Sequence, residues 1–238
     1  MKRYGLIGYP LTHSFSPSFF NEKFSKLNLD ATYASIEIED LSNAMPRFEF
    51  SLYHGLNVTI PYKEQIIPFL DGLSNEAQLI GAVNCIEIAE DKLIGHNTDW
   101  IGFKQAIERI IKPYHQSALV LGSGGSSKAV KFALEALKIN YQVISRTGVN
   151  TYEALQQKDV ETNLVIINTT PLGMYPNVQL KPAIPFAAIT KYHLVFDLIY
   201  NPLETAFLKE CKPHGAQVKN GLEMLELQAE ASWEIWNR

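Results

Sequence analysis

Residues 118–138 read ALVLGSGGSSKAVKFALEALK, which is an apolar run, a glycine-rich turn and an amphipathic helical pattern in succession. This order predicts the strand, turn and helix that open a mononucleotide-binding βαβ unit. Gly122, Gly124 and Ser127 have the spacing of the dinucleotide fingerprint, with serine in the place of the third glycine. The first glycine allows the tight turn, and the second lets the main chain approach a pyrophosphate at the helix N-terminus. Two alternatives to a dinucleotide site are a turn with a purely structural role and the similar turn that methyltransferases use.

Further apolar runs extend this unit to a parallel sheet. They read YQVIS (141–145), NLVIIN (163–168) and LVFDLIY (194–200), which predicts a doubly wound fold. The first run leads into Ser145, Arg146 and Thr147, where an NAD enzyme usually has an acid for the ribose 2′-hydroxyl. Because arginine pairs with a 2′-phosphate, the arginine after this strand favours NADP over NAD. The alternative is a solvated arginine.

Upstream of residue 100, short apolar runs alternate with helical patterns, which predicts a separate N-terminal α/β unit. One run, GLNVTIPYKE (55–64), carries polar residues within a strand pattern. Alternation places Asn57 and Thr59 on one face of that strand. Pro61 suits the first turn of a helix, so Lys63 is expected near the strand-to-helix junction. These polar groups form either a ligand site or a solvated strand face with a surface lysine.

Serines precede the next helical pattern, in GYPLTHSFSP (8–17). Ser16 is expected as the N-cap of a helix with Pro17 at its first position. Ser14 and Ser16 together would bind a carboxylate through their hydroxyls and the helix dipole. His13 has no visible partner in the sequence, and we interpret it as structural.

Two more polar residues stand at the ends of apolar runs, Asn84 in GAVNCIEI (81–88) and Asp99 in GHNTDWIGF (95–103). Asp99 or its predecessor is the expected N-cap of a helix that leads into the second domain. If Asp99 also faced Lys63, it would keep that lysine charged and ready to protonate an alkoxide formed from a carbonyl. The alternative for Asp99 is a simple helix cap.

Composition narrows the class of protein. The 238 residues suit two domains, and a net charge of -4 with a pI near 5.9 argues against a nucleic-acid surface. The two cysteines have no metal-binding or redox spacing, so no metal site is predicted. No segment reaches membrane-spanning length or resembles a signal peptide, so we expect a cytoplasmic protein without a membrane partner.

Taken in order, these segments resemble the shikimate dehydrogenases. The resemblance runs over nearly the whole chain and is carried by GYPLTHSFSPSFFN, GLNVTIPYKE, GAVNC, HNTDWIGF, GSGGSS, SRT, NTTPLGM, DLIYNPLET and NGLEMLELQA. It implies reversible, NADP-dependent reduction of 3-dehydroshikimate to shikimate in aromatic amino-acid biosynthesis. It also implies an N-terminal substrate domain, residues 1–99 completed by 222–238, and a Rossmann domain over 100–221, with the substrate between them.

The resemblance also assigns roles to single residues. Lys63 and Asp99 become the catalytic pair. The substrate would be held by side chains from both domains: Ser14, Ser16, Asn57, Thr59, Asn84, Tyr200 and Gln228. NADP would be held by the glycine-rich loop, the strand end and two later segments: Gly122, Ser123, Gly124, Gly125, Ser126, Ser127, Ser145, Arg146, Thr147, Asn168, Thr169 and Gly221.

The chain departs from the family pattern in three places. Cys85 stands where threonine is usual, and Asn150 stands where many members carry a second basic residue, which weakens the NADP prediction. The stretch between SRT and NTTPLGM is too short for a full helix and its loops. The open alternatives are an NAD-using quinate/shikimate dehydrogenase and a catalytically silent paralogue that binds shikimate or nucleotide. The family contains both monomers and homodimers.

Overall fold

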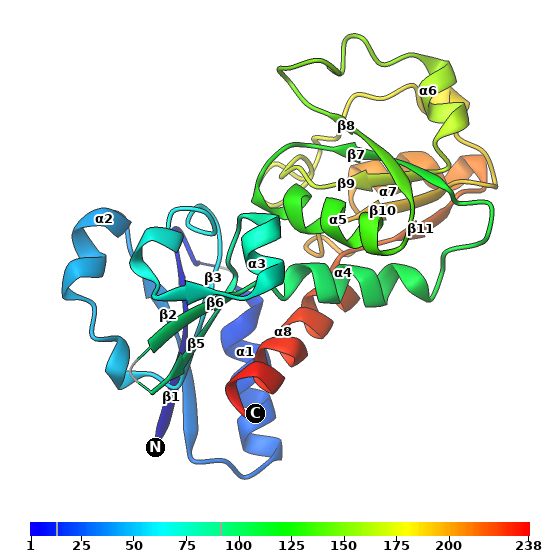
Figure 1. Ribbon diagram of the computed structural model, residues 1–238. Coiled ribbons are helices and arrows are strands. Elements are labelled where there is room, and N and C mark those ends of the chain that lie inside the picture. Colours follow the sequence, from blue (N-terminus) through cyan, green and yellow to red (C-terminus); the bar gives the residue numbers. More distant parts are fainter. Residues whose placement is uncertain (13, 91) are drawn as a thin grey trace. The chain divides into compact units, whose positions relative to one another are not determined.

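The computed structural model describes residues 1–12, 14–90 and 92–238. They form two compact units, Met1–Thr98 with Ala229–Arg238, and Asp99–Gln228. Each unit contains one β-sheet and its own helices (Figure 1), and the predicted α/β class is confirmed. Helix α8 (Leu222–Trp236), which was expected to belong to the first domain as a whole, is divided between the units after Gln228.

The first unit is a six-stranded mixed sheet with the order β2-β1-β3-β5-β6-β4. Strand β1 pairs in parallel with β2 and β3, whereas β5 is antiparallel to β3 and β6. The strands are β1 (Lys2–Gly8), β2 (Ala31–Glu37), β3 (Gly55–Val58), β4 (Gly72–Leu73), β5 (Cys85–Ala89) and β6 (Lys92–His96). The helices are α1 (Phe15–Lys26), α2 (Leu41–Ala44) and α3 (Asn75–Ile80).

Two local expectations in this unit are wrong. Helix α1 begins at Phe15 with Ser14 as its N-cap, so Ser16 lies inside the first turn. Residues 61–66 form turns that lead into a 3-10 helix, η3 (Ile67–Phe69), rather than an α-helix. Pro68 explains the second difference, because proline has no N–H to continue the helical ladder and restricts the residue before it.

The second unit has a five-stranded, fully parallel sheet with the order β11-β10-β9-β7-β8. Its strands are β7 (Ser117–Leu121), β8 (Asn140–Ile144), β9 (Val165–Asn168), β10 (Leu194–Asp197) and β11 (Gln217–Lys219). Its helices are α4 (Asp99–Glu108), α5 (Gly125–Ala136), α6 (Gln157–Thr162) and α7 (Ala206–Cys211), with the start of α8. Strands β7, β9 and β10 are apolar almost throughout because helices cover both faces of a parallel sheet.

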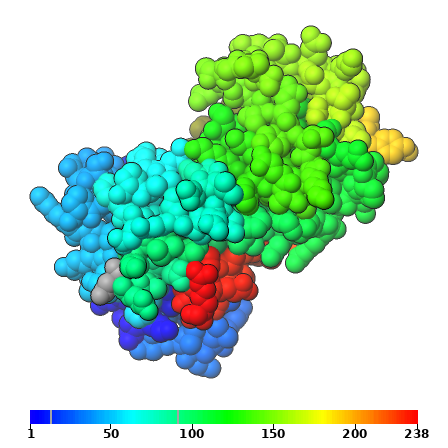
Figure 2. Space-filling view, viewed as in Figure 1, coloured from blue at the N-terminus to red at the C-terminus, as the bar shows by residue number. Residues whose placement is uncertain are grey.

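The end of α8 completes the first unit. Ala229, Trp233 and Trp236 pack into an aromatic cluster with Tyr4 and Phe20. Trp236 Nε1 donates to the carbonyl of Ile86 at 3.0 Å. Figure 2 shows the chain end, in red, at the surface of this unit. Within the described ranges, no helix combines the length and apolar character needed to cross a membrane.

Candidate functional site

The glycine-rich turn of the second unit has the geometry that the sequence predicts. Gly122 has a φ of +110°, and a Cβ on it would lie 2.7 Å from Thr169 Oγ1, so only glycine fits. Gly124 is the N-cap of α5, and a Cβ there would meet nothing within 4 Å. The main chain at the start of this twelve-residue helix is therefore open to a phosphate group.

Ser127 has a different environment from the rest of the turn. It is 1% exposed, and its hydroxyl donates to the carbonyl of Gly124 at 2.6 Å. A small residue is required here for close packing of helix against sheet, which is the role of the third glycine in the fingerprint. Ser123, Gly124, Gly125 and Ser126 remain the accessible members of the turn.

The strand end that carries the predicted 2′-phosphate site is a closed loop. Ser145 N–H donates to the carbonyl of Asn150 at 3.0 Å, and Ser145 pairs with Thr151 in an isolated bridge. The Ser145 hydroxyl also donates to the carbonyl of Thr147. Arg146 and Thr147 lie exposed in this loop, where a phosphate could reach both.

A buried carboxylate joins the ends of β9 and β10. Asp197 is fully buried, accepts from Asn168 Nδ2 at 2.9 Å and accepts from the Thr205 hydroxyl at 2.7 Å. Asn168 Oδ1 in turn accepts from the N–H and hydroxyl of Thr170, at 3.0 and 2.7 Å. Asn168 is 0% exposed, so it shapes the loop after β9 from inside.

That loop backs the glycine-rich turn. The N–H and hydroxyl of Thr169 both donate to the carbonyl of Leu121, at 2.9 and 2.8 Å. Gly221, at the start of α8, lies so close to β10 that a Cβ would be 2.0 Å from Leu198 O. Half-buried Tyr200 follows the end of β10. The predicted nucleotide residues thus meet at the carboxyl edge of one parallel sheet, where α/β folds bind ligands.

Asp99 and Gln228 belong to two helices, α4 and α8, that touch at Gly102. A Cβ on Gly102 would lie 2.4 Å from Met224 O and 2.9 Å from Gln228 N, so the two helices touch main chain to main chain. Asp99 is one turn before Gly102 on the same helix face. Both Asp99 and Gln228 are buried, at 6% and 7% exposure.

In the first unit, the structure joins Asn57 directly to Asn84. Asn57 Nδ2 donates to the carbonyl of Asn84 and to Ser232 Oγ, both at 3.0 Å. Its Oδ1 accepts from the Tyr33 hydroxyl at 2.8 Å. Since both amide hydrogens are used inside the protein, Asn57 can offer a ligand only its oxygen.

Asn84 holds the segment that precedes Asp99. Its Oδ1 accepts from Thr98 N at 2.6 Å, and its Nδ2 donates to Thr98 Oγ1 at 2.9 Å. The carbonyl of Lys63 accepts from Val83 N at 2.7 Å, which ties the Lys63 turn to the residue before Asn84. Thr59 follows β3 and donates its N–H to Ile7 O at 2.9 Å.

Ser14 and Ser16 flank the start of α1. The Ser14 hydroxyl makes no capping bond to the helix. Ser16 is 8% exposed. His13, interpreted as structural, lies outside the described residues. Lys63 and Asp99 belong to different units, and their pairing stays a prediction.

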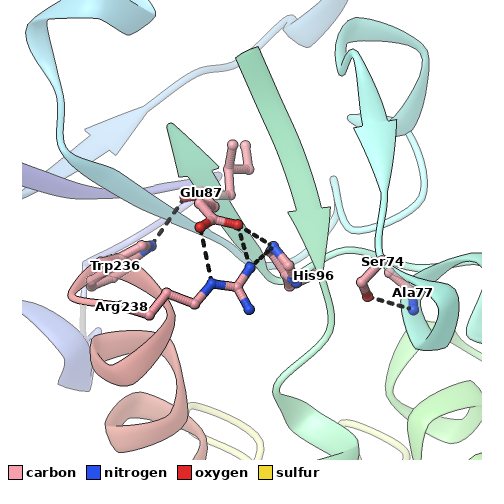
Figure 3. A network of polar contacts seen from close by, with 7 residues as sticks. Ser74, Ala77, Glu87, His96, Trp236 and Arg238 are labelled. Atoms are coloured by element: carbon pink, nitrogen blue, oxygen red, sulfur yellow. Dashed lines mark hydrogen bonds and ion pairs between the residues drawn. The ribbon is translucent and has the colours of Figure 1, made fainter. Parts of the chain in front are cut away.

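The hairpin that leads to Asn97 and Thr98 is anchored by an ionic network (Figure 3). Glu87 accepts from Arg238 Nε at 3.0 Å and lies 2.9 Å from His96 Nε2. The Arg238 guanidinium holds the pKa of Glu87 below its ordinary value, although burial opposes this. Trp236 adds its bond to Ile86 from the same helix end.

Known proteins share this architecture. A family model described as the shikimate dehydrogenase substrate binding domain matches residues 6–86. A relative named Shikimate dehydrogenase (NADP(+)), from Methanococcus aeolicus, is 42% identical and aligns over 99% of this chain and 91% of its own length. The chain belongs to the shikimate dehydrogenase family. The resemblance found in the sequence is thereby confirmed.

Solved shikimate dehydrogenases have the same fold. The enzyme from Aquifex aeolicus has a TM-score of 0.89 at 36% identity, covering 100% of this chain and 92% of that chain. The enzyme from Thermus thermophilus, solved with NADP(H) and shikimate, has a TM-score of 0.88 at 32% identity, covering 99% of this chain and 93% of that chain.

The departures from the shikimate dehydrogenase pattern have local explanations. Cys85 is fully buried, and burial raises the pKa of its thiol to about 12, so it is an unreactive core residue. The short stretch after SRT contains one short helix, the six-residue α6. Asn150 supplies a carbonyl that closes the loop around Arg146.

Sequence reasoning missed several residues that hold the site. Asp197 could have been suspected, since a lone acid within the apolar run LVFDLIY must be satisfied by buried donors. Ser232 is 0% exposed in a mostly apolar helix face and gives a similar signal. Tyr33 gives no such signal in the sequence, because tyrosine is common in strands.

Asp197 predicts a pH dependence of stability. Burial raises its pKa from 3.8 to about 6, against the hydrogen bonds from Thr205, Ile199 and Asn168. Because the folded pKa is the higher one, the stabilising proton is fully bound below the unfolded value near 3.9 and is lost as pH rises through about 6. Between about pH 5 and about pH 7.5, the wild type should lose on the order of 1 kcal/mol relative to Asp197→Asn.

Urea unfolding of both proteins at the two pH values measures this difference. The comparison removes the contributions of all other titrating groups, which the two proteins share. Parallel pH profiles for wild type and Asp197→Asn would contradict the assignment.

Proposed function

We propose that this chain is an NADP-dependent shikimate dehydrogenase that interconverts shikimate and 3-dehydroshikimate. The observation that carries the proposal is the linked polar cluster of the first unit, in which Lys63 and Asn57 are tied to the Val83–Asn84 segment. The family membership supports the same reaction. The role belongs to aromatic amino-acid biosynthesis, and we place it in the cytoplasm, as a monomer or homodimer.

The second unit fits NADP. Gly122 and Gly124 leave room for the pyrophosphate at the start of α5, and Arg146 with Thr147 offers the 2′-phosphate a cation and a hydroxyl. Thr169 and Gly221, with Asn168 behind them, would border the nucleotide and the nicotinamide. When bound, NADP supplies the hydride acceptor for shikimate and NADPH the donor for the reverse reaction.

The residues expected at the substrate suit a small polyhydroxylated acid. Ser14 and Ser16 at the start of α1, with Tyr200, would hold the carboxylate by neutral donors and the helix dipole. Thr59, Asn84, Asp99 and Gln228 would hold the ring hydroxyls, and Asn57 would contribute its oxygen only. These hydrogen-bond partners matter because a buried ring hydroxyl without a partner costs about 1–3 kcal/mol.

Lys63 would move the proton. As dehydroshikimate is reduced, negative charge develops on the carbonyl oxygen, and a lysine ammonium can donate a proton to it. In the reverse direction the same nitrogen accepts the proton of the shikimate hydroxyl. Asp99 would keep the ammonium charged and orient it. The other side chains bind the substrate, orient it and exclude water.

Initial-rate assays with shikimate or quinate, each with NADP or NAD, test the proposal. We expect turnover with shikimate and NADP far above that of the other three combinations. Preferred turnover of quinate with NAD would move the chain to the quinate/shikimate activity. Binding of shikimate without turnover in any combination would identify a silent paralogue.

A further inference from the structure

Tyr33 lies behind the polar cluster of the first unit, although no motif contains it. It is the third residue of β2 and is 4% exposed. Its hydroxyl donates to Asn57 Oδ1 at 2.8 Å. One buried hydroxyl thus contacts Asn57, which is expected at the substrate and which donates in turn to the carbonyl of Asn84.

The Tyr33 ring and main chain are both fixed by helix α1. The ring stacks on Phe20, with centroids 4.6 Å apart and an interplanar angle of 10°. The Asn21 carboxamide pairs with the main chain of Tyr33, accepting from its N–H at 3.0 Å and donating to its carbonyl at 2.8 Å. The position of this hydroxyl is therefore set by the same helix that carries Ser16.

The Tyr33 hydroxyl and the Asn84 carbonyl together hold the Asn57 amide in one orientation. Burial raises the pKa of Tyr33 well above its ordinary value, so the phenol stays protonated and donates. The carbonyl of Asn84 can only accept, so it fixes Asn57 Nδ2, which also donates to Ser232 Oγ, and leaves Oδ1 to accept from the phenol. A turned amide would set Oδ1 against the carbonyl of Asn84 and lose that bond.

We propose that Tyr33 is a positioning residue of the substrate site, which acts through Asn57 on Asn84. Asn57 then serves chiefly to connect three segments of the first unit by hydrogen bonds. This inference rests on the proposed function, because it assumes that Asn84 contacts shikimate.

Tyr33→Phe removes the hydroxyl and keeps the ring. We expect KM for shikimate to rise about five- to fiftyfold, because a buried acceptor loses its donor and Asn57 gains freedom to turn. KM for NADP should stay within about twofold of wild type, since the nucleotide residues lie in the second unit. A merely structural role would lower the thermal midpoint without this split.

Tyr4→Phe is the matched control. Tyr4 belongs to the same aromatic cluster, is 1% exposed, and has a buried hydroxyl without a hydrogen-bond partner in the described part of the chain. Loss of that hydroxyl should leave KM for shikimate unchanged. An equal rise in both variants would overturn the proposal.

Ser232→Ala tests the Asn57 amide independently, because it removes an acceptor of Asn57 Nδ2 and leaves the Tyr33 hydroxyl in place. It should also raise KM for shikimate, and the double variant with Tyr33→Phe should cost less than the product of the two single effects. Unchanged KM for shikimate in both single variants, or parallel rises for shikimate and NADP, would reject the positioning role.

The failure of this inference can be told apart from failure of the proposed function. Turnover by the unmodified protein tests the function, whereas calorimetric titration with shikimate compares the variants even without turnover. Weaker shikimate binding by Tyr33→Phe than by Tyr4→Phe supports the positioning role, and equal binding refutes it.

Discussion

Lys63→Ala should lower kcat by roughly 10²–10⁴-fold with a much smaller change in KM for shikimate. The reason is that the ammonium acts on charge that exists only as the carbonyl oxygen becomes an alkoxide. The turn that carries Lys63 is held by its carbonyl bond to Val83 N at 2.7 Å, which the substitution leaves in place. Steady-state kinetics in both directions measure the effect.

Lys26→Ala is the control for this variant. Lys26 is an exposed lysine in the last turn of α1 that pairs with Glu22. Its removal should change kcat by less than about twofold, as expected for an exposed ion pair. A near-normal kcat for Lys63→Ala would take that residue out of the chemistry.

Arg146→Ala should raise KM for NADP by about ten- to a hundredfold and leave KM for NAD within about threefold. A charge-assisted hydrogen bond to the 2′-phosphate is lost, and NAD has no such group. No second basic residue stands at position 150 to compensate, since that position is asparagine. Kinetics with saturating shikimate and varied coenzyme give both constants.

Arg109→Ala, which removes an exposed arginine of the same unit that pairs with Glu223, controls for charge alone. It should affect the two coenzymes equally and weakly. If Arg146→Ala raised both KM values by the same factor, the 2′-phosphate would have another partner.

Much of the fold is predictable from the sequence because its signals are local. The strand, glycine turn and helix of residues 118–138 occupy adjacent positions, and the structure has them as β7, Gly122 and α5. The prediction of a helix after Pro61 was wrong, and the reason, Pro68, is also visible in the sequence. The predicted N-cap of α1 lies two residues after the observed one, which is within the usual uncertainty of helix ends.

The site is only partly predictable, since its supporting contacts join distant parts of the chain. Asn57 and Ser232 are 175 positions apart, and no local pattern relates them. Asn57 was expected to face a ligand, yet its amide hydrogens are used by Asn84 and Ser232. Alternation identifies which side chains share a face, but it does not tell whether their partners are protein or substrate.

The return of α8 to the first unit has a consequence for biosynthesis on the ribosome. Residues 229–238 are made after the whole of the second unit, yet Trp236 packs so closely on Gly55 that a Cβ there would lie 2.4 Å from its ring. The second unit is contiguous and can fold as it emerges, because domains generally fold as units during synthesis. The first unit precedes it in the chain but acquires its last core residues only after the second unit has been made.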